Sequence, residues 1–269
     1  MPADRFTSAR GAVWPIETAG DGPPVLALHG VGGGAYFFRG LAGRLDDRYR
    51  VIATDLPSGL APDGSVAPAD MATWADDLVE YLAAREREPV VVVGHSLGTI
   101  LALELWRRAP RAVRALVFVG GVPRVRDQVR PRLADRADAI EASHRMDGWG
   151  ARIAPGVFGP RALRERPELV GLFERLLEAH PPATYVRNMR ALLAASAVDV
   201  VSTVTVPCLS ISGTDDAYAP PESVEAFLDQ LPQPCARVMM DGVGHMPFFE
   251  APAEFARAVG TFLAMLSRD

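Results

Sequence analysis

Ser96 lies where a serine nucleophile would need to stand. It sits in the stretch Gly-His-Ser-Leu-Gly at 94–98, directly after four consecutive valines at 90–93. The valines predict a strand buried on both faces, and apolar residues at helical spacing over 99–108 predict a helix. The flanking glycines let strand and helix approach closely, while the helix N-terminus favours negative charge beside the serine. The spacing is typical of a nucleophile elbow.

A serine hydroxyl needs a base, and a histidine base needs a carboxylate that fixes its tautomer. Two loops can supply them. Asp216, with Asp215 beside it, follows an apolar run at 208–212, and His245 follows a run at 237–240. If both runs are strands of one parallel sheet, their carboxyl ends share an edge with Ser96. The sequence therefore predicts a Ser96–His245–Asp216 triad.

The elements that must position these groups alternate between strand and helix. Predicted strands cover 25–28, 50–54, 90–93, 115–119, 208–212 and 237–240, and predicted helices cover 69–87, 99–108, 221–231 and 252–266. This alternation predicts an α/β fold with a doubly wound, mostly parallel sheet flanked by helices. From 123 to 197 no strand-like run occurs. We interpret 123–197 as a helical cap inserted in a core made of 1–122 and 198–269.

Composition narrows the class of protein. The chain has 269 residues, is 49% hydrophobic and 23% charged, and carries a formal net charge of −5. The acidic balance argues against nucleic acid and anionic membranes as partners. No cluster has metal-ligand spacing and no phosphate-binding glycine motif follows a strand, so we expect neither metal nor cofactor. The first ten residues lack the apolar core of a signal peptide, so we expect a cytoplasmic protein. The oligomeric state stays open.

Four motifs together resemble the α/β-hydrolase superfamily, in particular its cap-bearing serine hydrolases. They are His29-Gly30 after a strand, the elbow at 94–98, the turn Gly213-x-x-Asp216-x-x-x-Pro220, and Gly244-His245-x-x-x-x-Glu250-x-Pro252. The resemblance covers nearly the whole chain and implies an eight-stranded sheet. It also implies that Asp216, not Asp215, is the triad acid. A serine at the elbow excludes the dehalogenase and epoxide hydrolase branches, because their alkyl-enzyme ester requires a carboxylate.

The resemblance places an oxyanion hole at the backbone N–H groups of Val31 and Leu97. Substrate contacts are harder to choose, and the candidates are Gly32, Trp149, Phe158, Tyr185, Asn188 and Arg190. The three aromatic residues either line a pocket or form the core of the cap. Asn188 and Arg190 either contact a polar substrate group or lie on the surface. The remaining cap arginines at 124, 126, 130, 132 and 136 are expected on a solvated face, as are His144 and His180. His29 and His95 are expected to be structural, and Asp55 either caps a loop or orients the oxyanion segment.

These residues predict a cofactor-free serine hydrolase that cleaves a small or medium carboxylic ester or lactone through an acyl-enzyme. Two alternatives remain open. The same residues could hydrolyse a carbon–carbon bond of a vinylogous diketone, although relatives with that activity usually carry Asn at the position of His95. The chain could also be a small-molecule receptor derived from a hydrolase, which would turn over slowly or only once.

Overall fold

The fold centres on one eight-stranded sheet. The computed structural model describes residues 3–45, 48–59 and 69–267. The strands are β1 (Ala3–Thr7), β2 (Val13–Ala19), β3 (Pro24–Leu28), β4 (Arg50–Thr54), β5 (Val90–His95), β6 (Val113–Val119), β7 (Cys208–Gly213) and β8 (Ala236–Met240). Their order in the sheet is β1-β2-β4-β3-β5-β6-β7-β8. β1 and β2 pair antiparallel with their neighbours, and all other pairs are parallel, which confirms the predicted sheet.

Burial follows from position in the sheet. Every residue of β3, β5 and β7 is buried, because helices cover both faces of these strands. In β2, the second strand from the edge, only Trp14 and Ile16 are buried, so one face carries the apolar residues. β1 lies outside it and pairs with it from Ala3↔Glu17 to Thr7↔Val13.

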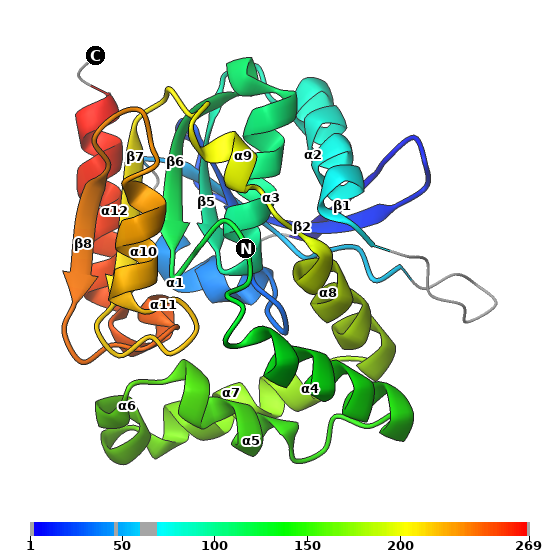
Figure 1. Ribbon diagram of the computed structural model, residues 1–269. Coiled ribbons are helices and arrows are strands. Elements are labelled where there is room, and N and C mark those ends of the chain that lie inside the picture. The colour runs from blue at the N-terminus through cyan, green and yellow to red at the C-terminus, as the bar shows by residue number, and fades with distance from the viewer. Residues whose placement is uncertain (1–2, 46–47, 60–68, 268–269) are drawn as a thin grey trace.

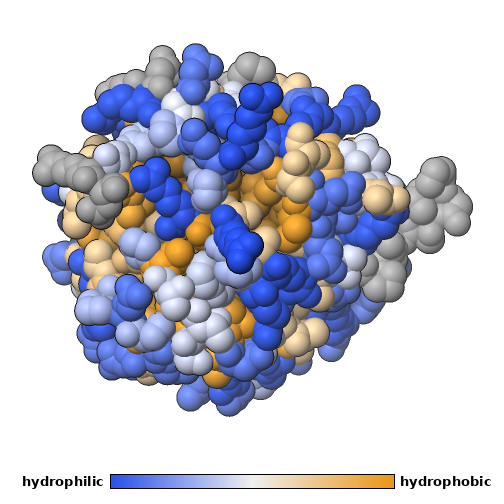
Figure 2. Space-filling model, turned by 90° about the horizontal axis from the view of Figure 1, so that it is seen from above, coloured by the Kyte–Doolittle hydropathy of each residue, from blue (hydrophilic) through white to orange (hydrophobic). Residues whose placement is uncertain are grey.

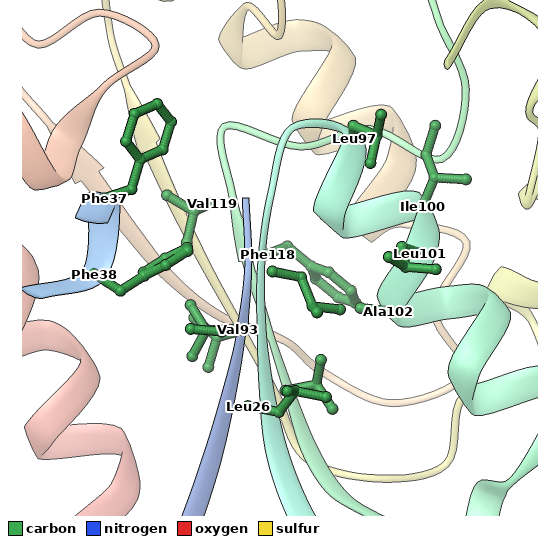
Figure 3. Packing of buried hydrophobic residues seen from close by; sticks show 14 of the residues in the cluster. Leu26, Phe37, Phe38, Val93, Leu97, Ile100, Leu101, Ala102, Phe118 and Val119 are labelled. Carbon is green, nitrogen blue, oxygen red and sulfur yellow. The ribbon is translucent and has the colours of Figure 1, made fainter. Parts of the chain in front are cut away.

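Helices of the core cover both faces of the sheet. The core helices and short helical turns are η1 (Ala35–Phe38), α1 (Arg39–Ala42), α2 (Met71–Arg85), α3 (Leu97–Arg108), η2 (Pro110–Ala112), α9 (Val198–Val201), α10 (Pro221–Leu228), α11 (Pro247–Glu250) and α12 (Pro252–Leu266). Figure 3 shows the sheet edge-on: Leu26 and Phe118 point toward α3, whereas Val93 and Val119 point to the opposite face with Phe38. Successive side chains of a strand thus pack into two separate apolar cores, one on each face of the sheet.

Helix α2 shows how local sequence sets an element's bounds. The expected helix began at 69, but the structure starts it at Met71 because the Asp70 carboxylate accepts a hydrogen bond from the Thr73 amide at 2.7 Å. Trp74 and Leu78 lie on its buried face, which packs against α3.

Five further helices lie between β6 and β7 in the chain. They are α4 (Arg130–Ser143), α5 (Trp149–Val157), α6 (Pro160–Glu165), α7 (Pro167–Glu178) and α8 (Pro182–Ala194), and we refer to them as the helical layer. Figure 1 shows this layer beyond the carboxyl ends of the strands. The chain leaves and re-enters the core at one place, where the Ala197 amide donates to the Pro123 carbonyl at 2.8 Å.

The opposite end of the molecule presents the amino ends of the parallel strands. Figure 2 shows that apolar side chains gather near the middle of this face and are ringed by polar ones. Over the described ranges, no helix is both long and apolar enough to cross a membrane.

Candidate active site

The elbow holds Ser96 in a rare backbone conformation. Ser96 has φ 53° and ψ −114°, a combination that costs on the order of 1–3 kcal/mol and persists only where packing enforces it. The flanking glycines provide that packing. A Cβ on Gly94 would lie 2.3 Å from the Gly98 carbonyl oxygen, and one on Gly98 would lie 2.1 Å from the Leu28 oxygen. Both glycines are therefore needed for the close crossing of strand and helix.

His245 and Asp216 form a buried pair at the same edge of the sheet. His245 Nδ1 donates to Asp216 Oδ2 at 2.8 Å, and the Asp216 side chain is completely buried. The other carboxylate oxygen, Oδ1, accepts from the amides of Tyr218 and Ala219, each at 2.9 Å. Because the proton is held on Nδ1, Nε2 of the neutral imidazole is the acceptor.

Asp215 and Gly120 show why Asp216 occupies this place. Asp215 is exposed, and its amide donates to the Val243 carbonyl at 2.9 Å. Gly120 directly follows β6 and has φ 51°, and a Cβ there would lie 3.1 Å from both Asp216 Oδ2 and His245 Nδ1. The glycine leaves the space in which carboxylate and imidazole meet.

The loop after β3 packs directly against the elbow. A Cβ on Gly30 would lie 2.9 Å from the Ser96 Cβ, which puts the backbone at 30–31 beside the serine. Within the described part of the chain, no residue accepts a hydrogen bond from the amides of Val31 or Leu97. Two unpaired N–H groups at a helix N-terminus and an adjoining loop are the type of donor that an oxyanion requires.

Two side chains beneath this loop fix its position. His29 Nε2 accepts a hydrogen bond from the Leu56 amide at 3.0 Å, which agrees with its expected structural role. The Asp55 carboxylate accepts from the Ala35 amide at 2.6 Å, at the start of η1, so of the two roles weighed for Asp55 the structure favours capping the loop. The loops after β3 and β4 thereby hold one another.

His95 packs against His245. Its Nε2 donates to the His245 carbonyl at 3.0 Å, while its buried Nδ1 has no hydrogen-bond partner among the described residues. Burial, followed by the nearby His245, lowers the pKa of His95 well below its ordinary value. The ring therefore stays neutral and keeps a donor on the His245 backbone.

Ser96 and His245 both line a two-lobed cavity between the sheet edge and the helical layer. The first lobe, of about 390 Å³ with its opening, is lined by Ile100, Val122, Val125 and Val129 and by Arg124 and Arg126 at its rim. The second, of about 520 Å³ with its opening, extends under α5, α7 and α8 and is lined mainly by apolar residues. Leu133, Leu192 and Tyr218 line both lobes. Ligand sites commonly have this predominantly apolar lining with a few polar groups.

The predicted substrate contacts are only partly brought to this cavity. Of the predicted contacts Tyr185 lines the second lobe, as does Val31 of the predicted oxyanion hole. Gly32 lies behind the lining, where a Cβ would meet Leu177 and Tyr185.

The prediction is wrong for the other four residues, because none of them lines either lobe. Each packs against a different neighbour instead. Trp149 carries the Arg152 guanidinium 5.0 Å from its ring, and Phe158 packs edge-on to Phe173 in the core of the helical layer. Asn188 is buried beside Arg187, and Arg190 is exposed and pairs with Asp138 and Glu141.

Arg136 overturns the expectation that the arginines of this segment form a solvated face. It is only 8% exposed and lines the second lobe. Its guanidinium donates to the hydroxyls of Tyr218 at 3.0 Å and Tyr185 at 3.4 Å. The missed signal is its spacing, since Arg136 stands three residues after Leu133 and four before Ile140 on the buried stripe of α4. His180 is likewise half-buried against the Gly32 backbone, not solvated.

Glu250 ties the His245 loop to the helical layer. Its Oε1 accepts from the amides of Gly244 at 3.0 Å and Met246 at 3.4 Å, and its Oε2 accepts from the Gly159 amide at 2.8 Å. The His245 amide donates to the Val157 carbonyl at 2.7 Å. The motif that includes Glu250 was visible in the sequence, but its bridging role was not.

Comparison with known proteins assigns the chain to a family. The model of the Alpha/beta hydrolase family matches residues 25–258, and the chain belongs to that family. It is 29% identical to a pimeloyl-[acyl-carrier protein] methyl ester esterase of Chromobacterium violaceum, over 92% of this chain and 97% of that protein.

Solved structures share the fold. A thermophilic esterase from Thermogutta terrifontis superposes with a TM-score of 0.87 at 23% identity, covering 99% of each chain. An enol-lactonase from Burkholderia xenovorans LB400 gives a TM-score of 0.85 at 17% identity, over 97% of this chain and all of that one. Across the described residues, no three His, Cys, Asp or Glu side chains gather as a metal site.

Proposed function

We propose that the protein is a serine hydrolase that cleaves a small or medium carboxylic ester or lactone, with Ser96, His245 and Asp216 as its triad. The observation that carries the proposal is the buried 2.8 Å contact between His245 and Asp216, at a cavity that Ser96 also lines. The esterase activity named for its relative supports the choice of an ester bond.

In the proposed mechanism His245 Nε2 takes the proton of the Ser96 hydroxyl as the oxygen attacks the substrate carbonyl. The Asp216 carboxylate keeps the Nδ1 proton in place and stabilises the imidazolium that forms. The amides of Val31 and Leu97 donate to the tetrahedral oxyanion. His245 then protonates the leaving alcohol and, in the second half-reaction, activates the water that hydrolyses the acyl-enzyme.

We further propose that residues 123–197 act as a cap that selects the substrate. The helical layer supplies Leu133, Tyr185 and Leu192 to the cavity lining, whereas the proposed reacting groups all come from the sheet edge. Substrate preference and chemistry are therefore carried by different elements.

The test is steady-state hydrolysis of a panel of p-nitrophenyl esters of graded acyl length, with lactones assayed beside them. We expect multiple turnovers on at least one substrate class, and a loss of roughly 10⁶-fold in kcat for Ser96→Ala. Retained turnover in Ser96→Ala would contradict the proposed nucleophile. Single-turnover behaviour of the wild type would instead support the receptor alternative, and turnover of a vinylogous diketone alone the carbon–carbon one.

A further inference from the structure

Arg136 is a buried cation in the second lobe of the cavity, which is lined mainly by apolar residues. Of its five N–H donors, two are directed to the tyrosine hydroxyls, and in the described chain no carboxylate pairs with the guanidinium. The exposed Arg190 on the neighbouring helix α8, by contrast, contacts both Asp138 and Glu141. Arg136 is therefore a buried cation of the described cavity lining that is available to a ligand.

Leaving a guanidinium buried without a counter-ion is unfavourable, because desolvation is not offset by an ion pair. The acidic residues on its own helix do not offset it, since Asp135, Asp138 and Glu141 face solvent. The other faces packed around it bring phenols and apolar side chains, among them Tyr185, Tyr218 and Met189. An unfavourable charge held in a binding cavity is typical of a group that is neutralised by the substrate.

We propose that Arg136 binds a carboxylate carried by the substrate, so that the enzyme prefers the monoester of a dicarboxylic acid, or a lactone bearing a carboxylate, to a neutral ester. This inference rests on the proposed function of the same site. A planar guanidinium matches a carboxylate with two parallel hydrogen bonds. The apolar lining between Arg136 and Ser96 suits the methylene chain that joins the two ends of such a substrate.

Tyr218 fixes the distance between Arg136 and the proposed catalytic residues. Its amide donates to Asp216, its ring lies 5.2 Å from the His245 ring, and its hydroxyl accepts from Arg136. The guanidinium is thus held at a fixed separation from the reacting groups. A substrate carboxylate bound there places the ester carbonyl at Ser96 only if the intervening chain has the matching length.

The charges around the cavity also favour an anionic substrate. The linings of the two lobes, as far as the structure describes them, contain no Asp or Glu. Arg124 and Arg126 also line the first lobe, and Arg124 pairs with Asp127 outside the lining. A protein with a net charge of −5 therefore presents a positive cavity to its substrate. An anion is attracted to this cavity more strongly than the overall charge predicts.

The experiment compares matched pairs of methyl esters. One member is the monomethyl ester of a dicarboxylic acid, and the other has a methyl group in place of the free carboxylate, across a series of chain lengths. In the wild type we expect kcat/KM to favour the anionic member, with a maximum at one length. In Arg136→Met that ratio falls about 10- to 100-fold, as expected for lost hydrogen bonds to a charged group, and Arg136→Lys restores part of it.

Arg190→Met is the matched control, because it removes a cation of the same helical layer outside the cavity, and it should retain the wild-type ratio. A ratio also cancels any fraction of misfolded enzyme. Equal kcat/KM values for both members in the wild type, or an unchanged ratio in Arg136→Met, overturn the inference while leaving ester hydrolysis intact.

A calorimetric measurement separates this inference from the proposed function. If no ester is hydrolysed, the proposed function fails. Binding of the dicarboxylate monoester to Ser96→Ala, lost in the double variant with Arg136→Met, still supports the carboxylate subsite, and equal binding to both variants overturns it.

Discussion

The sheet edge and the helical layer bury charge in opposite ways. At the sheet edge Asp216 accepts three hydrogen bonds, two from backbone amides and one from His245. In the helical layer Arg136 donates to two tyrosine side chains and meets no carboxylate in the described chain. A fully satisfied group is preorganised for one reaction, whereas an unpaired cation is available to a ligand. Under the proposed function, the sheet edge performs the chemistry and the helical layer selects the substrate.

The two regions are joined at the His245 loop. Glu250 accepts hydrogen bonds from both sides, and a Cβ on Gly244 would lie 2.6 Å from the Gly159 amide nitrogen. The helical layer therefore rests on the backbone that carries the proposed base. The predictions below test how far the two regions act separately.

The largest effect, on kcat, is expected from substitution of Asp216 at the sheet edge. Asp216→Asn should hold His245 in the wrong tautomer, a change that costs about 10⁴-fold in kcat in a serine protease, or roughly 5 kcal/mol of barrier. Asp215→Asn, at the exposed neighbour, should cost less than about tenfold. We would measure kcat for both, with circular dichroism to confirm folding. The reverse ranking would refute the assignment.

Glycine substitutions contrast the packing of the two regions. Gly98→Ala forces a Cβ against the Leu28 oxygen and should lower the free energy of unfolding by about 3 kcal/mol. Gly171→Ala in α7, whose Cβ would meet only the end of the flexible Arg175 side chain at 3.4 Å, should raise it by about 0.5–1 kcal/mol. Urea unfolding of both variants measures the difference. Similar destabilisation in both would mean that the edge is no more tightly packed than the layer.

Stability should depend on pH through the histidines behind the site. Burial lowers the pKa of His29 and His95, so both stay neutral in the folded state while the unfolded chain takes up protons below about pH 6.5. The free energy of unfolding is therefore full above that pH and falls on acidification, by about 1.4 kcal/mol per pH unit for each histidine.

His95→Asn, which keeps a donor for the His245 carbonyl, should remove one histidine's share of this slope in urea unfolding followed from about pH 7.5 to about pH 5.5. The control is His144→Asn at an exposed position with φ 52°, a conformation that Asn accepts readily. A slope unchanged in His95→Asn, or equally reduced in the control, would show that burial of His95 does not govern the response.

The smallest effect is expected at the junction of the two regions. Glu250→Gln replaces one acceptor oxygen by an amide that repels the backbone donors, and should lower kcat about fivefold, near 1 kcal/mol, by loosening the His245 loop. Glu254→Gln, four residues on and exposed, is its control. If kcat is unchanged in Glu250→Gln while thermal stability falls, Glu250 serves folding alone.

The sequence predicted the sheet edge well because backbone requirements leave local signals. Glycines at 94 and 98, a valine run and the order of strand-end loops specify the elbow and the pairing of His245 with Asp216. These signals are short-range or set by sheet topology, and the observed Asp216–His245 contact follows from both.

The helical layer was predicted poorly for the opposite reason. Its helices were expected as a class, but which side chains face the cavity depends on how five helices pack together, and composition does not reveal that. Arg190 looked like a polar contact and proved to be an exposed ion pair, whereas Arg136 looked solvated and lines the cavity. The only sign in the sequence that Arg136 is buried is its helical spacing from Leu133 and Ile140.

The central claim is that Ser96 is the activated nucleophile of this edge. The direct measurement is the intact mass of the protein after treatment with a fluorophosphonate, followed by peptide mapping. The account predicts one adduct on the wild type, located on Ser96, and none on Ser96→Ala. An adduct that persists in Ser96→Ala, or that maps to another residue in the wild type, would contradict it.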